Sequence, residues 1–125
     1  MNGVKAFSAN ELTAADCQAF DEYVVKWQKI LNLCDWRIER SSKRAPKNMA
    51  EVTFDNGARL ASYRVGLSFG SAKVTSASLE STALHEVLHV LLHDILEAEP
   101  LALEGAEHRV INVLEKLLLK GVHES

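Results

Sequence analysis

The 125-residue chain has few cysteines, only Cys17 and Cys34. Neither belongs to a C-x-x-C pair, which excludes a four-cysteine zinc site and a dithiol redox motif. We expect two reduced cytosolic thiols, partly buried, that behave as small hydrophobic side chains.

The chain also lacks long apolar runs and a strong excess of charge of one sign. No stretch approaches the ~18 apolar residues of a membrane span. The first five residues contain no apolar segment suited to a secretory signal, so we expect a cytoplasmic location. The net charge of −3 is mild, and the basic stretch 37–47 has no interleaved aromatic residues. We therefore expect neither a membrane nor nucleic acid as a partner.

Length and composition predict one soluble globular domain spanning residues 1–125. The chain is 47% apolar and 25% charged, which is typical of such domains. Apolar residues recur every three or four positions over 9–32, where Ser8 to Glu11 has the form of a capping box, so this segment predicts a long helix.

The pattern then changes to alternation, which predicts three short strands: one around Trp36 and Ile38, one around Val52 and Phe54, and one over 61–69. Asp55-Asn56-Gly57 indicates a hairpin between the second and third strands, because Asn and Gly tolerate a positive φ.

Two further helices are expected after the strands. The first covers about 79–96, with Ser78 as N-cap and Glu80 favourable in its first turn. The second runs from about Pro100 to Lys120, with Gly121 as C-cap. The order predicts an α+β fold: a long N-terminal helix, a small three-stranded sheet, a buried helix and a C-terminal helix.

The buried helix carries an H-E-x-x-H motif formed by His85, Glu86 and His89. Residues four apart lie on one helix face, so the two histidines can hold one metal ion. Glu86 is placed to accept a proton from a metal-bound water. His93, one turn further on, is expected to lie beside the ligands or at the surface.

A catalytic zinc usually takes three protein ligands, and the last helix offers candidates for the third. Periodicity predicts a buried stripe there, which comprises Leu103, Ala106, Val110, Val113, Leu114 and Leu117. Glu107 lies within this stripe and His108 at its edge. A carboxylate among apolar residues needs a cation, so Glu107 is the preferred third ligand and His108 the alternative.

These residues resemble the gluzincin branch of zincin metallopeptidases. More closely, the chain resembles the minimal zincin-like metallopeptidases often encoded by phages and prophages. The shared features are a leading helix, a Trp36-x-Ile38 strand, the pattern from Leu84 to His89, and the segment Glu107-His108-x-Val110. The resemblance implies a zincin-like core, zinc bound by His85, His89 and Glu107, and Glu86 as general base.

The expected function is therefore a zinc-dependent peptidase acting on a peptide or protein. Tyr63, His93 and His108 are candidate oxyanion donors. The third strand is expected to pair with an extended substrate. The alternative is a catalytically idle, zinc-stabilised protein-binding module on the same scaffold.

Overall fold

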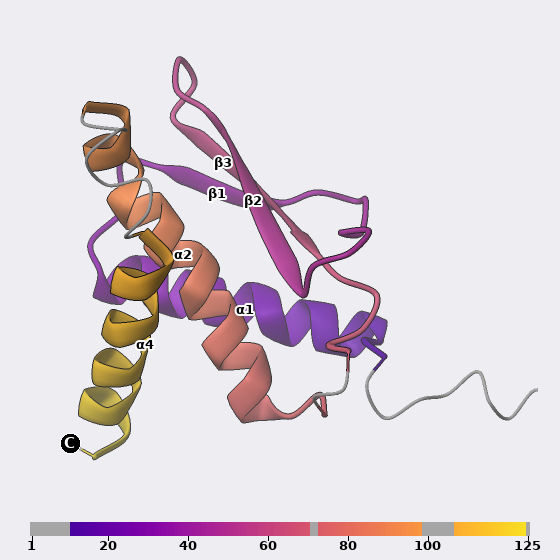
Figure 1. Cartoon of the computed structure of the whole chain (residues 1–125). Coiled ribbons are helices and arrows are strands. Elements are labelled where there is room, and N and C mark those ends of the chain that lie inside the picture. The colour runs from indigo at the N-terminus through magenta and orange to yellow at the C-terminus, as the bar shows by residue number, and fades with distance from the viewer. Residues whose placement is uncertain (1–10, 71–72, 99–106, 125) are drawn as a thin grey trace, which may run out of the picture.

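The computed structural model describes residues 11–70, 73–98 and 107–124. These residues form three helices and one three-stranded mixed sheet, which confirms the predicted α+β class and the predicted order of elements (Figure 1). The elements are α1 (Ala14–Ile30), β1 (Arg37–Arg40), β2 (Ala50–Asp55), β3 (Leu60–Val65), α2 (Ser76–Ala98) and α4 (Glu107–Glu124).

The sheet has the strand order β1-β3-β2, so β3 is its central strand. β1 pairs with β3 in parallel, with Ile38 opposite Ala61. β2 pairs with β3 antiparallel, with Val52 opposite Tyr63. The prediction that the third strand pairs with a substrate is therefore wrong, because both edges of β3 are already occupied. The edge strand that flanks α2, the helix carrying the motif, is β2.

The predicted hairpin between β2 and β3 is present, but its conformation differs from the expected one. Four residues, 56–59, connect the two strands. The positive φ of 51° falls on Arg59, while neither Asn56 nor Gly57 has a positive φ. The Asp55 carboxylate accepts a hydrogen bond from the Ala58 N–H at 3.2 Å, which fixes the turn from its first residue.

Helix α1 begins later than expected and helix α2 begins earlier, because a threonine caps each of them. α1 starts after Thr13, whose hydroxyl accepts the Asp16 N–H at 3.1 Å, while the Asp16 carboxylate accepts the Thr13 N–H at 2.9 Å. The box predicted at residues 8–11 lies mostly outside the described residues. α2 starts after Thr75, which exchanges hydrogen bonds with Ser78. Ser78 is thus the third helical residue and not the N-cap.

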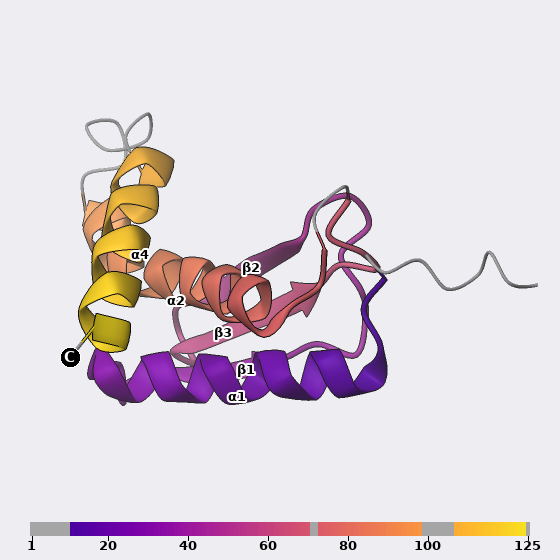
Figure 2. The same cartoon turned by 90° about the horizontal axis from the view of Figure 1, so that it is seen from below.

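Helices α1 and α2 pack against each other and cover one face of the sheet (Figure 2). The Phe20 ring of α1 lies 5.5 Å from the Tyr63 ring of β3. Glu80, expected to serve the first turn of α2, is instead buried between the helices. Its carboxylate accepts hydrogen bonds from Lys26 Nζ at 2.6 Å and from Trp27 Nε1 at 2.8 Å. This pair fixes α2, and the motif it carries, against α1.

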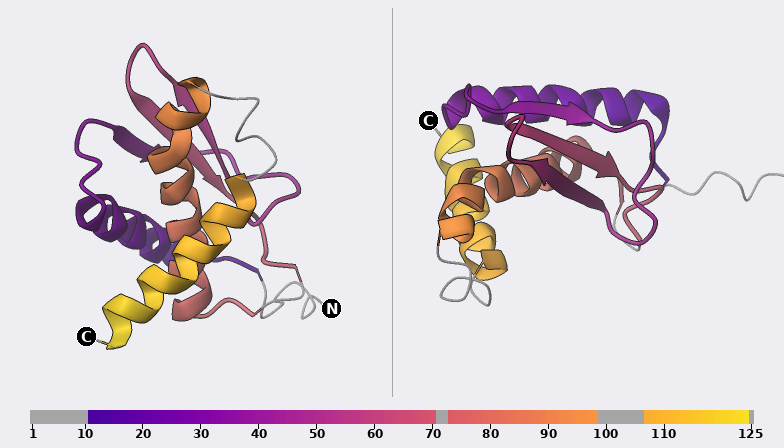
Figure 3. Two further views of the ribbon diagram at one scale, coloured as in Figure 1. Left: turned by 60° about the vertical axis from the view of Figure 1, so that its left-hand side comes forward. Right: turned by 90° about the horizontal axis from the view of Figure 1, so that it is seen from above.

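Helix α4 lies across α2 (Figure 3). The predicted first turn at Pro100 lies outside the described residues, and the helix continues through Gly121 to Glu124. The predicted buried stripe is wrong in part: Val110, Val113 and Leu117 are exposed, while Ile111 is fully buried. The face turned to α2 is therefore rotated from the predicted one, which brings His108 toward the motif.

The two cysteines differ in environment. Cys17 is buried in α1, as expected, whereas Cys34 is exposed, so the expectation of burial is wrong for Cys34. Within the described ranges, no helix combines the length and the apolar character needed to cross a membrane.

Candidate metal centre

Three histidines converge where α4 crosses α2. His85 and His89 lie one turn apart on α2, and His108 is the second residue of α4. Each offers a ring nitrogen, and the three ligand atoms all lie within 4.8 Å of one another. Nitrogen ligands lie about 2.0–2.1 Å from zinc, so three nitrogens at this spacing need only small side-chain rotations to share one ion.

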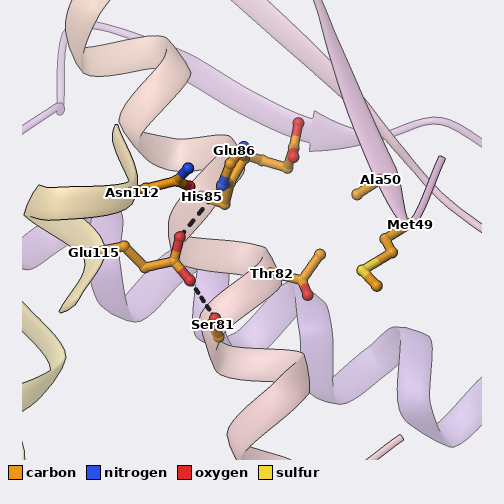
Figure 4. A pocket seen from close by; sticks show the side chains of 8 residues that line it. All are labelled: Met49, Ala50, Ser81, Thr82, His85, Glu86, Asn112 and Glu115. Atoms are coloured by element: carbon orange, nitrogen blue, oxygen red, sulfur yellow. Dashed lines mark hydrogen bonds and ion pairs between the residues drawn. The ribbon is translucent and has the colours of Figure 1, made fainter. Parts of the chain in front are cut away.

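The Nδ1 atom of each of the two α2 histidines contacts a glutamate carboxylate of α4. Glu107 Oε2 lies 2.5 Å from His89 Nδ1, and Glu115 Oε2 lies 3.2 Å from His85 Nδ1. The Ser81 hydroxyl donates a hydrogen bond to the other oxygen of Glu115 (Figure 4). With both Nδ1 atoms engaged, the Nε2 atoms are the ones left to bind a metal. Such histidine–carboxylate pairs orient metal ligands and raise their basicity.

Burial and the contacts between histidines and carboxylates shift the pKa values of His85, His89 and Glu115 in opposite directions. The hydrogen bond to Glu115 raises the pKa of His85, outweighing its burial. Burial lowers the pKa of His89, although Glu107 opposes this. Burial acts to raise the pKa of Glu115, but its hydrogen bonds with His85 and Ser81 outweigh burial and lower it. Glu115 is thus an ionised acceptor suited to holding the imidazole of His85.

Glu86 is a buried carboxylate that has no hydrogen-bond or ion-pair partner among the described residues. Only 6% of the residue is exposed, and no hydrogen bond or ion pair joins it to any other residue of the described ranges. Burial raises its pKa to about 7, against the opposing effect of nearby His85. A buried, unpaired carboxylate costs free energy unless water or a cation compensates it. Its position beside three imidazoles therefore fits a site that holds a metal ion and water.

Two open cavities meet at this group. One, of about 420 Å³, lies beside the three histidines and is lined by Asn48, Ala50, Glu51, Val52, His85, Glu86, His89 and His108. The other, of about 270 Å³, lies toward the start of α2 and is lined by Met49, Ala50, Ser81, Thr82, His85, Glu86, Asn112 and Glu115 (Figure 4). The start of β2 forms the wall opposite the helices. Together the cavities make a cleft between the sheet edge and the helix pair.

The structure assigns different positions to the two residues predicted as third ligand. His108, the alternative, lies with His85 and His89. Glu107, the preferred residue, contacts His89 Nδ1 and is not among the three residues whose ligand atoms converge. Both residues lie one turn before the buried Ile111, and both reach α2, but Glu107 is engaged by His89 Nδ1 whereas His108 joins the two α2 histidines.

Two other predicted site residues lie away from this centre. Tyr63 is buried under α1, where its hydroxyl donates a hydrogen bond to Asp21 at 2.6 Å. His93 stacks on Phe54 at 3.8 Å between ring centroids, and its Nε2 lies 2.6 Å from Asn56 Oδ1. Neither residue lines the cleft.

The sequence reasoning missed the residues that complete the cleft. These residues, none of which the sequence pattern identifies as part of a site, are Glu115, Ser81, Asn48 and Asn112. Glu115 had a detectable signal, since it lies two turns after His108 on one face of α4. Asn48 comes from a loop whose position depends on sheet pairing, and local pattern does not encode that pairing.

Comparison of the sequence with known protein-family models gives no match, and neither curated proteins nor solved structures include a match.

Proposed function

We propose that the chain is a zinc-dependent peptidase with His85, His89 and His108 as metal ligands and Glu86 as general base. The observation that carries the proposal is the buried Glu86 carboxylate, which has no partner in the part of the chain that the structure describes, next to three converging imidazoles. A purely structural metal site does not need such a carboxylate. Three histidine ligands leave a fourth position for water, as catalytic zinc sites require.

In this mechanism the residues of the chain bind and move protons. When bound, a zinc ion supplies Lewis-acid activation of water and of the scissile carbonyl. Glu86 accepts the proton of the attacking water at a carboxylate oxygen and then delivers it to the leaving amine. Glu107 and Glu115 keep His89 and His85 in the tautomer that presents Nε2.

The edge of β2 supports an extended substrate. The Gly66 N–H donates to the Met49 carbonyl at 2.7 Å, and bonded pairs alternate along an antiparallel ladder. Glu51 therefore turns its backbone groups toward β3, whereas Ala50 and Val52 turn theirs toward the outer edge, which no described strand covers. A peptide paired there gains main-chain hydrogen bonds next to Glu86.

The test combines metal analysis with hydrolysis of an unfolded protein such as reduced casein. Wild type should hold one zinc per chain and cleave the protein. Glu86→Gln should keep its zinc and lose about 10²–10⁴-fold in rate, the contribution of a general base. Glu22→Gln, on the exposed side of α1 and outside both cavities, is the matched control and should retain most activity.

The result also separates the enzyme from the idle binding module. If wild type holds no stoichiometric zinc after metal loading, both readings fail. If it holds zinc but cleaves nothing, or if Glu86→Gln cleaves as fast as wild type, the peptidase reading fails and the zinc-stabilised module remains.

A further inference from the structure

The cleft continues on both sides of Glu86. The two cavities described above share Ala50, His85 and Glu86. Thr82 lines only the cavity toward the start of α2, and His89 lines only the cavity beside the three histidines. The proposed reacting group therefore lies at the junction of two open spaces and not at the end of a closed pocket.

The edge strand spans this junction. Met49 lines the cavity toward the start of α2, Ala50 lines both, and Val52 lines the cavity beside the histidines. A strand advances about 3.4 Å per residue, so a chain paired along this edge places residues in both cavities while one of its peptide bonds lies next to Glu86. Figure 4 shows Thr82 and Ala50 on opposite walls of the same space.

Apart from Glu86, which the proposed mechanism uses as the general base, the described walls offer no group that is available to bind a chain terminus. Recognition of a terminal carboxylate calls for Arg or Lys, and recognition of a terminal amine calls for a free carboxylate. None of the described residues that line the two cavities is Arg or Lys. Glu51 is engaged by Asn48 at 3.3 Å and Arg64 at 3.7 Å, and Glu115 by His85 and Ser81.

We infer that this site takes internal segments of extended polypeptides, so that the enzyme is an endopeptidase. The inference rests on the proposed function and names its substrate class. The substrate has to be locally unfolded, because pairing with the β2 edge requires an extended backbone. Neither a free amino terminus nor a free carboxyl terminus contributes to binding.

The first test compares matched peptides. An internally quenched peptide of about ten residues, acetylated and amidated, is assayed beside the same sequence with free termini, and products are identified by mass spectrometry. We expect similar kcat/KM for both forms and cleavage at an internal bond. Cleavage that requires a free terminus, with products shortened one residue at a time, would overturn the inference and leave the peptidase proposal intact. If neither peptide nor unfolded casein is cut by zinc-loaded protein, the proposed function itself fails.

The second test blocks one side of the cleft. Thr82→Phe should fill the cavity toward the start of α2 and lower kcat/KM for the blocked peptide by about tenfold or more, mainly through KM, with zinc content unchanged. Thr53→Phe, on the exposed face of β2 away from the cavities, is the control. If Thr82→Phe does not fold, Asn112→Phe enters the same cavity from α4. Unchanged cleavage by a folded, zinc-loaded variant of either kind would refute binding across both cavities.

Discussion

The identity of the third metal ligand can be tested because His108 and Glu107 are neighbours with different roles. Whole zinc sites in small domains contribute about 10–16 kcal/mol, so one ligand of three accounts for roughly 3 kcal/mol or more, on the order of a hundredfold in affinity. His108→Ala should cause a loss of this size. Glu107→Gln keeps an oxygen that accepts the Nδ1–H of His89, so its loss should stay within about tenfold.

The assay is competition for zinc against a chromophoric chelator at one fixed pH near neutrality, with helix content checked by circular dichroism. Arg109→Ala, which alters the next, exposed residue of α4, serves as the control and should bind zinc like wild type. A larger loss for Glu107→Gln than for His108→Ala would refute the assignment and make Glu107 the ligand. An equal, small loss for both would mean that neither residue binds the metal.

Two further predictions concern stability, measured by urea unfolding of the metal-free protein. Gly66→Ala should lower the free energy of unfolding by about 1–3 kcal/mol, because the added Cβ would lie 2.3 Å from the Asn48 carbonyl oxygen. Gly57→Ala is the control and should be nearly neutral, because its Cβ would meet nothing closer than 3.6 Å. Similar values for the two variants would contradict this prediction. Burial and the hydrogen bond to Asp21 raise the pKa of Tyr63 above its usual value of ~10, so its contribution is complete below pH ~10 and is lost above it, by up to ~1.4 kcal/mol per pH unit. Tyr63→Phe should flatten the fall in stability above pH ~10, and an unchanged slope would refute the shift.

Local pattern was sufficient to predict the elements whose two faces differ clearly. Alternation along β3 places Ala61, Tyr63 and Val65 on the buried face, and these residues alternate with polar ones in the sequence. The motif helix was predicted as buried because apolar residues surround it, and Leu84 and Leu88 are fully buried. Both features depend only on periodicity, which the sequence carries directly.

Periodicity could not predict which side of α4 faces the core. Apolar residues occur on two adjacent stripes of this helix, Val110–Val113–Leu117 and Ile111–Leu114–Leu118, and either could face the core. The choice depends on how α4 crosses α2, where Ile111 is buried and Leu117 is 61% exposed. Glu107 and His108 both lie one turn before Ile111, so periodicity alone does not decide which of them reaches the metal position.

The partners of buried polar groups could not be predicted from local sequence pattern either. Glu80 has the position and charge of a residue that serves a helix N-terminus, yet it pairs with Lys26 and Trp27 more than fifty residues earlier in the chain. The contact exists because α1 and α2 pack side by side, and no local signal specifies that packing. The same holds for the pairing of Glu115 with His85.

The junction of α4 with α2 has a consequence for the thermodynamics of the chain. Among the described side chains of α4, Ile111 is fully buried, and Leu114, Leu118 and Leu119 are partly buried against the core. The same helix supplies His108, Glu107 and Glu115. If zinc binds here, the free energy of zinc binding stabilises the packed position of the last helix, because binding and local folding are linked. Metal supply would then set how often this helix opens, and with it how readily proteases cleave the chain.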